Sequence, residues 1–158
     1  MDNYSVCFRD LRDKITTWTW QELLFGLSNN IIKVDDIIDY VNDLILKKSN
    51  NDSDLLIEII IADKDKVESI VRELASSEKK QCEKKIISKW IFLIIYHLYI
   101  SKNSNINNII DNIYCDFDYP SDIDCLVSYM PKEDSESQND KLQKYLVIGK
   151  NIWFTNKK

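Results

Sequence analysis

Apolar residues recur at intervals of three and four along most of this chain, the spacing that places them on one face of an α-helix. The first predicted helix begins at Thr19, whose hydroxyl can cap the opening turn while Glu22 returns a bond to the cap. It ends near Ser28. The same spacing predicts helices over residues 35–47, 54–62 and 64–76, and the last two can pair as a hairpin.

The longest predicted element runs from residue 78 to residue 101, and its second half, Trp90 to Ile100, is apolar nearly all round. A helix of this kind belongs at the centre of a bundle. A buried strand is the alternative, because β-branched and aromatic residues dominate the run. The lysine-rich residues before it and the lack of a turn signal favour a helix.

Shorter helices complete the predicted fold. Ser104 caps one that runs to Tyr114, Ser121 caps another that runs to about Tyr129, a last one covers residues 141–148, and Trp153 and Phe154 dock the tail. Two glycines and two prolines are too few for the turns of an all-β fold. We therefore predict an all-α fold: one domain over residues 1–158, a compact bundle of about seven to eight helices around the helix at 78–101.

Composition and cysteine usage place the chain among globular proteins of a reducing compartment. Of its 158 residues 44% are hydrophobic and 30% are charged. No Cys-x-x-Cys pair occurs, so we expect free, buried thiols rather than a zinc site at Cys7, Cys82, Cys115 and Cys125. No signal peptide is visible and no apolar run is long enough to span a bilayer, so a cytoplasmic protein without membrane contact is expected.

The aspartates around Pro120 invite a metal or hydrolase interpretation. A calcium loop requires a central glycine and a closing glutamate, and here Tyr119 and Pro120 occupy the middle. A hydrolase that uses Asp116 and Asp118 is the least favoured alternative.

The other usual catalytic and cofactor-binding patterns are also missing. His97 has only apolar residues and a serine at helical spacing, which favours a histidine packed in the core over a general base. The chain has no glycine-rich phosphate loop, because its glycines are the isolated Gly26 and Gly149. We predict a protein that is not an enzyme and needs no cofactor.

Charge is unevenly distributed along the chain. Between Asp111 and Asp140 nine acids face one base, Lys132, a net charge of minus eight in a chain whose total is minus five. A solvated face that keeps the protein soluble is one explanation, and a surface that binds a basic partner is the other. The net negative charge argues against nucleic acid as a partner, and we expect none. The predicted partner-binding residues are Asp111, Asp116, Asp118, Asp122, Asp124, Glu133, Asp134, Glu136, Asp35, Asp36, Asp39 and Asp43.

Two segments resemble an uncharacterised bacterial family of small helical proteins. The first is TWTWQELLFGL at residues 17–27, followed by VDDIIDY at residues 34–40. The second is IYCDFDYP at residues 113–120, followed by Ile123 and by SYMP at residues 128–131. The family carries no assigned chemistry that the resemblance could transfer to any residue.

Small, acidic, solitary bacterial domains of this kind are similar in character to immunity proteins, which protect a cell from a toxin. We therefore expect an immunity protein that binds a cognate toxin of a contact-dependent or polymorphic system, with a basic nuclease domain as the partner. A helical adaptor or structural interaction module is the alternative.

Overall fold

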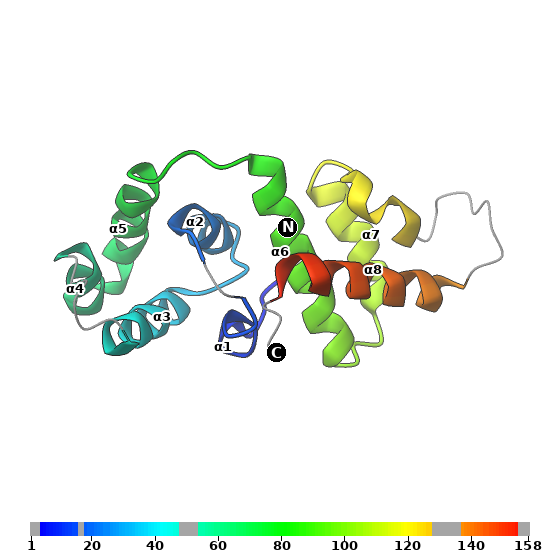
Figure 1. Ribbon diagram of the computed structural model, residues 1–158, viewed down its shortest axis with the longest axis horizontal. Coiled ribbons are helices and arrows are strands. Elements are labelled where there is room, and N and C mark those ends of the chain that lie inside the picture. Colours follow the sequence, from blue (N-terminus) through cyan, green and yellow to red (C-terminus); the bar gives the residue numbers. More distant parts are fainter. Residues whose placement is uncertain (1–3, 16–17, 48–53, 128–136, 155–158) are drawn as a thin grey trace. The chain divides into compact units, whose positions relative to one another are not determined.

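The computed structural model describes residues 4–15, 18–47, 54–127 and 137–154, and every regular element in these ranges is a helix (Figure 1). The predicted all-α fold is confirmed. The described residues contain eight α-helices and one 3-10 helix, η1. Their contacts divide the chain into an N-terminal unit, Asn3–Asp13 and Thr17–Cys82, and a C-terminal unit that comprises Glu83–Lys158 with Met1–Asp2 and Lys14–Thr16. The single domain over residues 1–158 stays a prediction.

The described residues of the N-terminal unit form five helices. α2 packs against α5, α3 contacts α4 and α5, and the predicted hairpin of α4 and α5 is present. The short helix α1 was not predicted, because five residues are too few to show helical spacing. It buries Phe8 and Leu11 and contacts α3. The bounds are α1 Phe8–Arg12, α2 Trp20–Ser28, α3 Val34–Lys47, α4 Asp54–Ile61 and α5 Lys64–Ser76.

The start of α2 is the predicted capping box. The Glu22 backbone N–H donates to the Thr19 hydroxyl at 3.2 Å, and the Thr19 backbone N–H donates to the Glu22 carboxylate at 2.9 Å. A second carboxylate completes this end: Glu78 accepts from the backbone N–H groups of Trp20 at 3.1 Å and Gln21 at 2.9 Å. These are N–H groups for which a helix has no internal partner.

The same contacts correct the predicted start of the central helix. We predicted a helix from residue 78, whereas α6 spans Glu83–Ile100. Residues 78–81 are bound to the start of α2 instead. The Gln81 backbone N–H donates to the side-chain oxygen of Gln21, and the side-chain N–H of Gln21 donates to the Lys79 carbonyl. The negative Glu78 carboxylate is favourable beside the positive end of the α2 dipole.

The C-terminal unit is built on α6, which contacts α7 (Ile106–Asp116) and α8 (Gln138–Trp153), while η1 (Ser121–Leu126) contacts α7 and α8. The run from Trp90 to Tyr96 is buried without interruption. A helix buries all of its faces only when neighbours cover each of them, so the helix is confirmed and the strand alternative is wrong.

Several predicted ends in this unit are corrected. α7 starts at Ile106 after Asn105, so Ser104 is not its cap. The short helix predicted after Pro120 is present as a 3-10 helix, but Ser121 is its first residue rather than its cap, and it ends at Leu126 rather than near Tyr129. α8 is longer than predicted, because the Ser137 hydroxyl accepts from the Asp140 backbone N–H at 3.2 Å and starts it earlier.

The end of α8 continues into the docked tail. Phe154 packs edge-on against Phe92, with ring centroids 5.4 Å apart, and against Tyr96, at 4.9 Å. Buried aromatic contacts of this kind stabilise the helix end against fraying.

Candidate binding surface and pocket

Five of the predicted acids follow one another along α7 and η1 in the C-terminal unit. Asp116 and Asp122 are exposed, as is Asp118 in the turn between the two helices. Asp111 and Asp124 are half-buried. We call these five residues the α7–η1 acids; Figure 1 shows α7 and η1 in yellow beside the orange α8.

A left-handed turn connects α7 to η1. Asp118 and Tyr119 have φ values of 63° and 56°, a conformation that non-glycine residues adopt rarely. The Tyr119 backbone N–H donates to the Tyr114 carbonyl at 2.7 Å, and the two tyrosine rings pack with centroids 5.2 Å apart. This bonding pattern closes the end of α7 and reverses the chain, so the aspartates of η1 follow directly after those of α7.

Hydroxyl groups hold two of the α7–η1 acids. Ser88 Oγ donates to Asp122 Oδ2 at 2.5 Å. The Tyr114 hydroxyl donates to Asp124, and this hydrogen bond raises the pKa of Tyr114 because it stabilises the neutral phenol beside a negative charge. A neutral donor orients a carboxylate without cancelling its charge.

The acids of α3 are held differently. The Asp36 carboxylate accepts from the Lys33 backbone N–H at 2.8 Å, at the start of the helix. Cationic side chains bind the other three: Asp35 pairs with Lys64 (2.7 Å), Asp39 with Arg9 (3.3 Å) and Arg12 (3.2 Å), and Asp43 with Lys47 (3.0 Å). The hydrogen bond from Arg9 lowers the pKa of Asp39. These ion pairs neutralise much of the negative charge of α3.

The predicted acidic residues therefore fall into three groups. The α3 acids belong to the N-terminal unit and the α7–η1 acids to the C-terminal unit. Glu133, Asp134 and Glu136 lie outside the described residues.

None of the four cysteines forms a disulfide, but the prediction that they are buried is wrong, since all four are exposed. Cys7 and Cys82 lie just before helices, Cys115 lies on the outer face of α7, and Cys125 lies in η1. In the described ranges no three His, Cys, Asp or Glu residues are grouped to hold a metal ion. No helix among the described residues has the length and hydropathy needed to cross a membrane.

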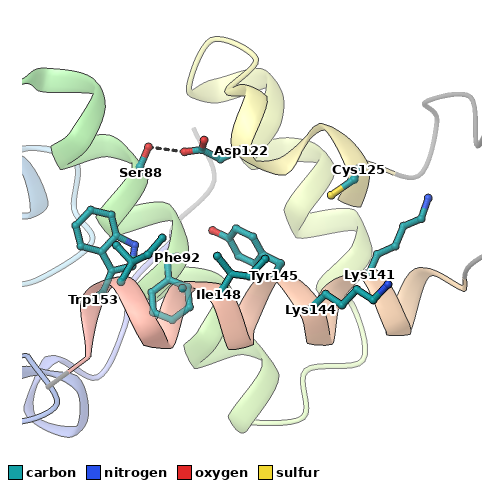
Figure 2. Close-up of a pocket in the computed structure, with 11 residues that line it drawn as sticks. Ser88, Phe92, Asp122, Cys125, Lys141, Lys144, Tyr145, Ile148 and Trp153 are labelled. Carbon is teal, nitrogen blue, oxygen red and sulfur yellow. Dashed lines mark hydrogen bonds between the residues drawn. The ribbon is translucent and has the colours of Figure 1, made fainter. Parts of the chain in front are cut away.

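A pocket of about 380 Å³ lies within the C-terminal unit between α6, η1 and α8 (Figure 2). Its apolar wall comprises Phe92, Tyr145, Ile148, Ile152 and Trp153. Asp122 is the one α7–η1 acid that lines it, so the Asp116 and Asp118 pair of the hydrolase alternative lies outside it. Sequence reasoning missed this pocket, because its residues come from three helices that are far apart along the chain.

Comparison with known proteins identifies a family. The profile of the family described as "Uncharacterized protein conserved in bacteria (DUF2247)" matches residues 8–147. Searches of curated proteins and of solved structures found no match. The family match includes both segments on which the predicted resemblance rests, and that prediction is confirmed. The chain belongs to the bacterial family DUF2247.

Proposed function

We propose that this protein is an immunity protein that binds a cognate bacterial toxin, a basic nuclease domain, through the α7–η1 acids. The proposal rests on the hydrogen bonds that Asp122 and Asp124 accept. Hydroxyl groups orient both carboxylates and leave their charge in place. Fixed negative charges of this kind favour pairing with lysine or arginine side chains of a partner protein and accelerate its association.

The α3 acids have a smaller part in the proposed interface. Asp35, Asp39 and Asp43 are already paired with cations of the same chain, and a partner would have to displace these cations first. We therefore assign the binding to the α7–η1 acids, with Asp122 and Asp124, which hydroxyl groups hold, at its centre.

The proposed mode of inhibition follows from the chemistry of nucleases. A nuclease binds phosphate groups with basic residues, and carboxylates compete for the same residues. The protein would then act by occupying the nucleic-acid site of the toxin, without chemistry or a cofactor of its own. We place it in the cytoplasm of a bacterium, where a nuclease meets its substrate.

The test first identifies a candidate toxin in the genes beside this protein's gene, where the immunity function requires a large secreted protein, and it uses the C-terminal domain of that protein. Its binding is measured by isothermal titration calorimetry at several salt concentrations. The variant carries asparagine at Asp116, Asp118, Asp122 and Asp124. Asparagine keeps an acceptor oxygen for the hydroxyl donors and tolerates the left-handed backbone of residue 118, so the fold is retained. We expect the variant to bind more weakly, with a loss of about 2–5 kcal/mol in binding free energy for each buried charge pair that is removed. We also expect its affinity to depend less on salt concentration.

A matched control removes the same charge elsewhere. It carries amides at four exposed acids outside both groups: Asp10, Asp65, Glu73 and Glu83. The control should bind the toxin domain nearly as wild type does. Equal losses in both variants would remove the α7–η1 acids from the interface, and failure of the wild-type protein to bind this domain and to protect cells that express it would refute the immunity function.

A further inference from the structure

We propose that the pocket between α6, η1 and α8 binds a small organic acid, with its apolar body against α8 and its carboxylate facing Lys141 and Lys144. This ligand is inferred from the pocket and not from toxin binding, although Asp122, one of the α7–η1 acids, also lines the pocket. Its volume of about 380 Å³ is within the range of pockets that enclose small ligands, about 300–1,000 Å³.

The apolar part of the ligand is dictated by the side chains of the long wall. Phe92, Tyr145 and Trp153 contribute rings to the pocket. Ile148 and Ile152 also line it, and they remain 59% and 61% exposed. Large apolar side chains left in contact with water at a concave site gain from a ligand that covers them.

The charge of the ligand is dictated by one end of the pocket. Lys141 and Lys144 come from the first turns of α8, at the end away from Trp153, as Figure 2 shows. Each ammonium group has three N–H donors, so it can bind a carboxylate and keep another contact. Two cations at one end of an apolar slot select a ligand with one apolar end and one anionic end.

The remaining polar groups in the pocket are consistent with this polarity. Asp122, the one carboxylate among the lining residues that the structure describes, accepts the Ser88 hydroxyl on the α6 side. Burial raises the pKa of Tyr145, with Asp122 and Cys125 adding to the effect, so its phenol stays protonated as a neutral donor.

The test compares three probes that share one tail: octanoate, 1-octanol and octylammonium. Their affinities are measured by isothermal titration calorimetry, and the methyl NMR signals of Ile148 and Ile152 report where they bind. We expect octanoate to bind roughly tenfold more tightly than the other two, as ion pairing with the half-buried Lys141 and the exposed Lys144 allows. Octanoate should also shift both isoleucine signals.

Two double variants separate a specific site from general attraction. Lys141→Gln with Lys144→Gln should lower the octanoate affinity to that of 1-octanol and leave 1-octanol unchanged. Lys84→Gln with Lys85→Gln removes the same charge from exposed positions on α6 outside the pocket and should have little effect. The proposal is overturned if octylammonium binds as tightly as octanoate, if neither isoleucine signal moves at saturating octanoate, or if the two double variants behave alike.

Discussion

The backbone of Gly149 in α8 lies directly against the Phe92 ring of α6. A Cβ atom at Gly149 would be 2.3 Å from the ring carbons Cδ2 and Cε2, closer than real contacts allow. Phe92 is buried and its ring also packs against Tyr96, Tyr145 and Phe154, which restrict its movement away from the glycine. The glycine therefore sets how closely α8 approaches α6.

Gly149→Ala should destabilise the protein, although alanine within a helix is usually favoured over glycine by about 1 kcal/mol. The overpacked contact should cost about 1–3 kcal/mol and reverse that preference. Urea unfolding followed by circular dichroism measures the change. Adding Phe92→Leu should recover part of the loss, because the smaller side chain makes room. An unchanged or raised midpoint for Gly149→Ala alone would contradict the close packing.

Glu78→Ala should destabilise the N-terminal unit by about 1 kcal/mol, because the first N–H groups of α2 lose their acceptor. Glu78→Gln keeps one acceptor oxygen and should cost less. Glu73→Ala, at an exposed position of α5, is the matched control. Equal unfolding midpoints for the two alanine variants would show that Glu78 does not cap α2.

Asp39 should titrate below the ordinary aspartate value of 3.8, since hydrogen bonding to Arg9 favours the ionised carboxylate. A lowered pKa in the folded state adds stability that is present above 3.8 and is lost as the pH falls through the native pKa. Arg9→Gln should return the pKa of Asp39 toward the ordinary value. Carboxyl NMR titration of both proteins measures the shift, and identical pKa values in the two would rule out the pairing.

The pKa of Tyr114 should lie above its ordinary value of 10, mainly because its hydroxyl donates a hydrogen bond to Asp124. A raised tyrosine pKa adds stability below pH 10 that is lost as the pH rises through the native pKa. Asp124→Asn should lower the pKa of Tyr114, because the amide is neutral. Titration of the assigned Tyr114 ring signal is the measurement. Asp118→Asn is the control, and a shift of the same size there would show that the charge of the segment, rather than this bond, is responsible.

Local patterns were sufficient for most of the helices. The bounds predicted for α3, α4 and α5 lie within one residue of those observed, because their apolar spacing and flanking polar residues are contained in each segment. The capping box of α2 was likewise found from Thr19 and Glu22, which are only three residues apart. The all-α fold follows from the same short-range signals.

Contacts between distant residues decided the rest. α6 starts at Glu83 rather than at residue 78, because Glu78 accepts hydrogen bonds from Trp20 and Gln21, which precede it by 58 and 57 residues. Asp39 and Asp122 both belong to predicted acidic stretches, yet the first is paired with Arg9 and the second accepts the Ser88 hydroxyl. A list of charges cannot distinguish a neutralised carboxylate from one that keeps its charge, since the partner is set by packing.

The contact between Gly149 and Phe92 shows the same division between sequence and tertiary structure. The sequence by itself determined that the protein is helical, which segments form most of its helices and where acids are concentrated, because hydrogen bonds and apolar spacing within a helix involve residues three or four apart. Only the tertiary structure decided that Gly149 meets Phe92, that the cysteines are exposed and that α6, η1 and α8 enclose a pocket. Those features depend on which helix faces meet, and helix faces meet through side chains far apart in the sequence.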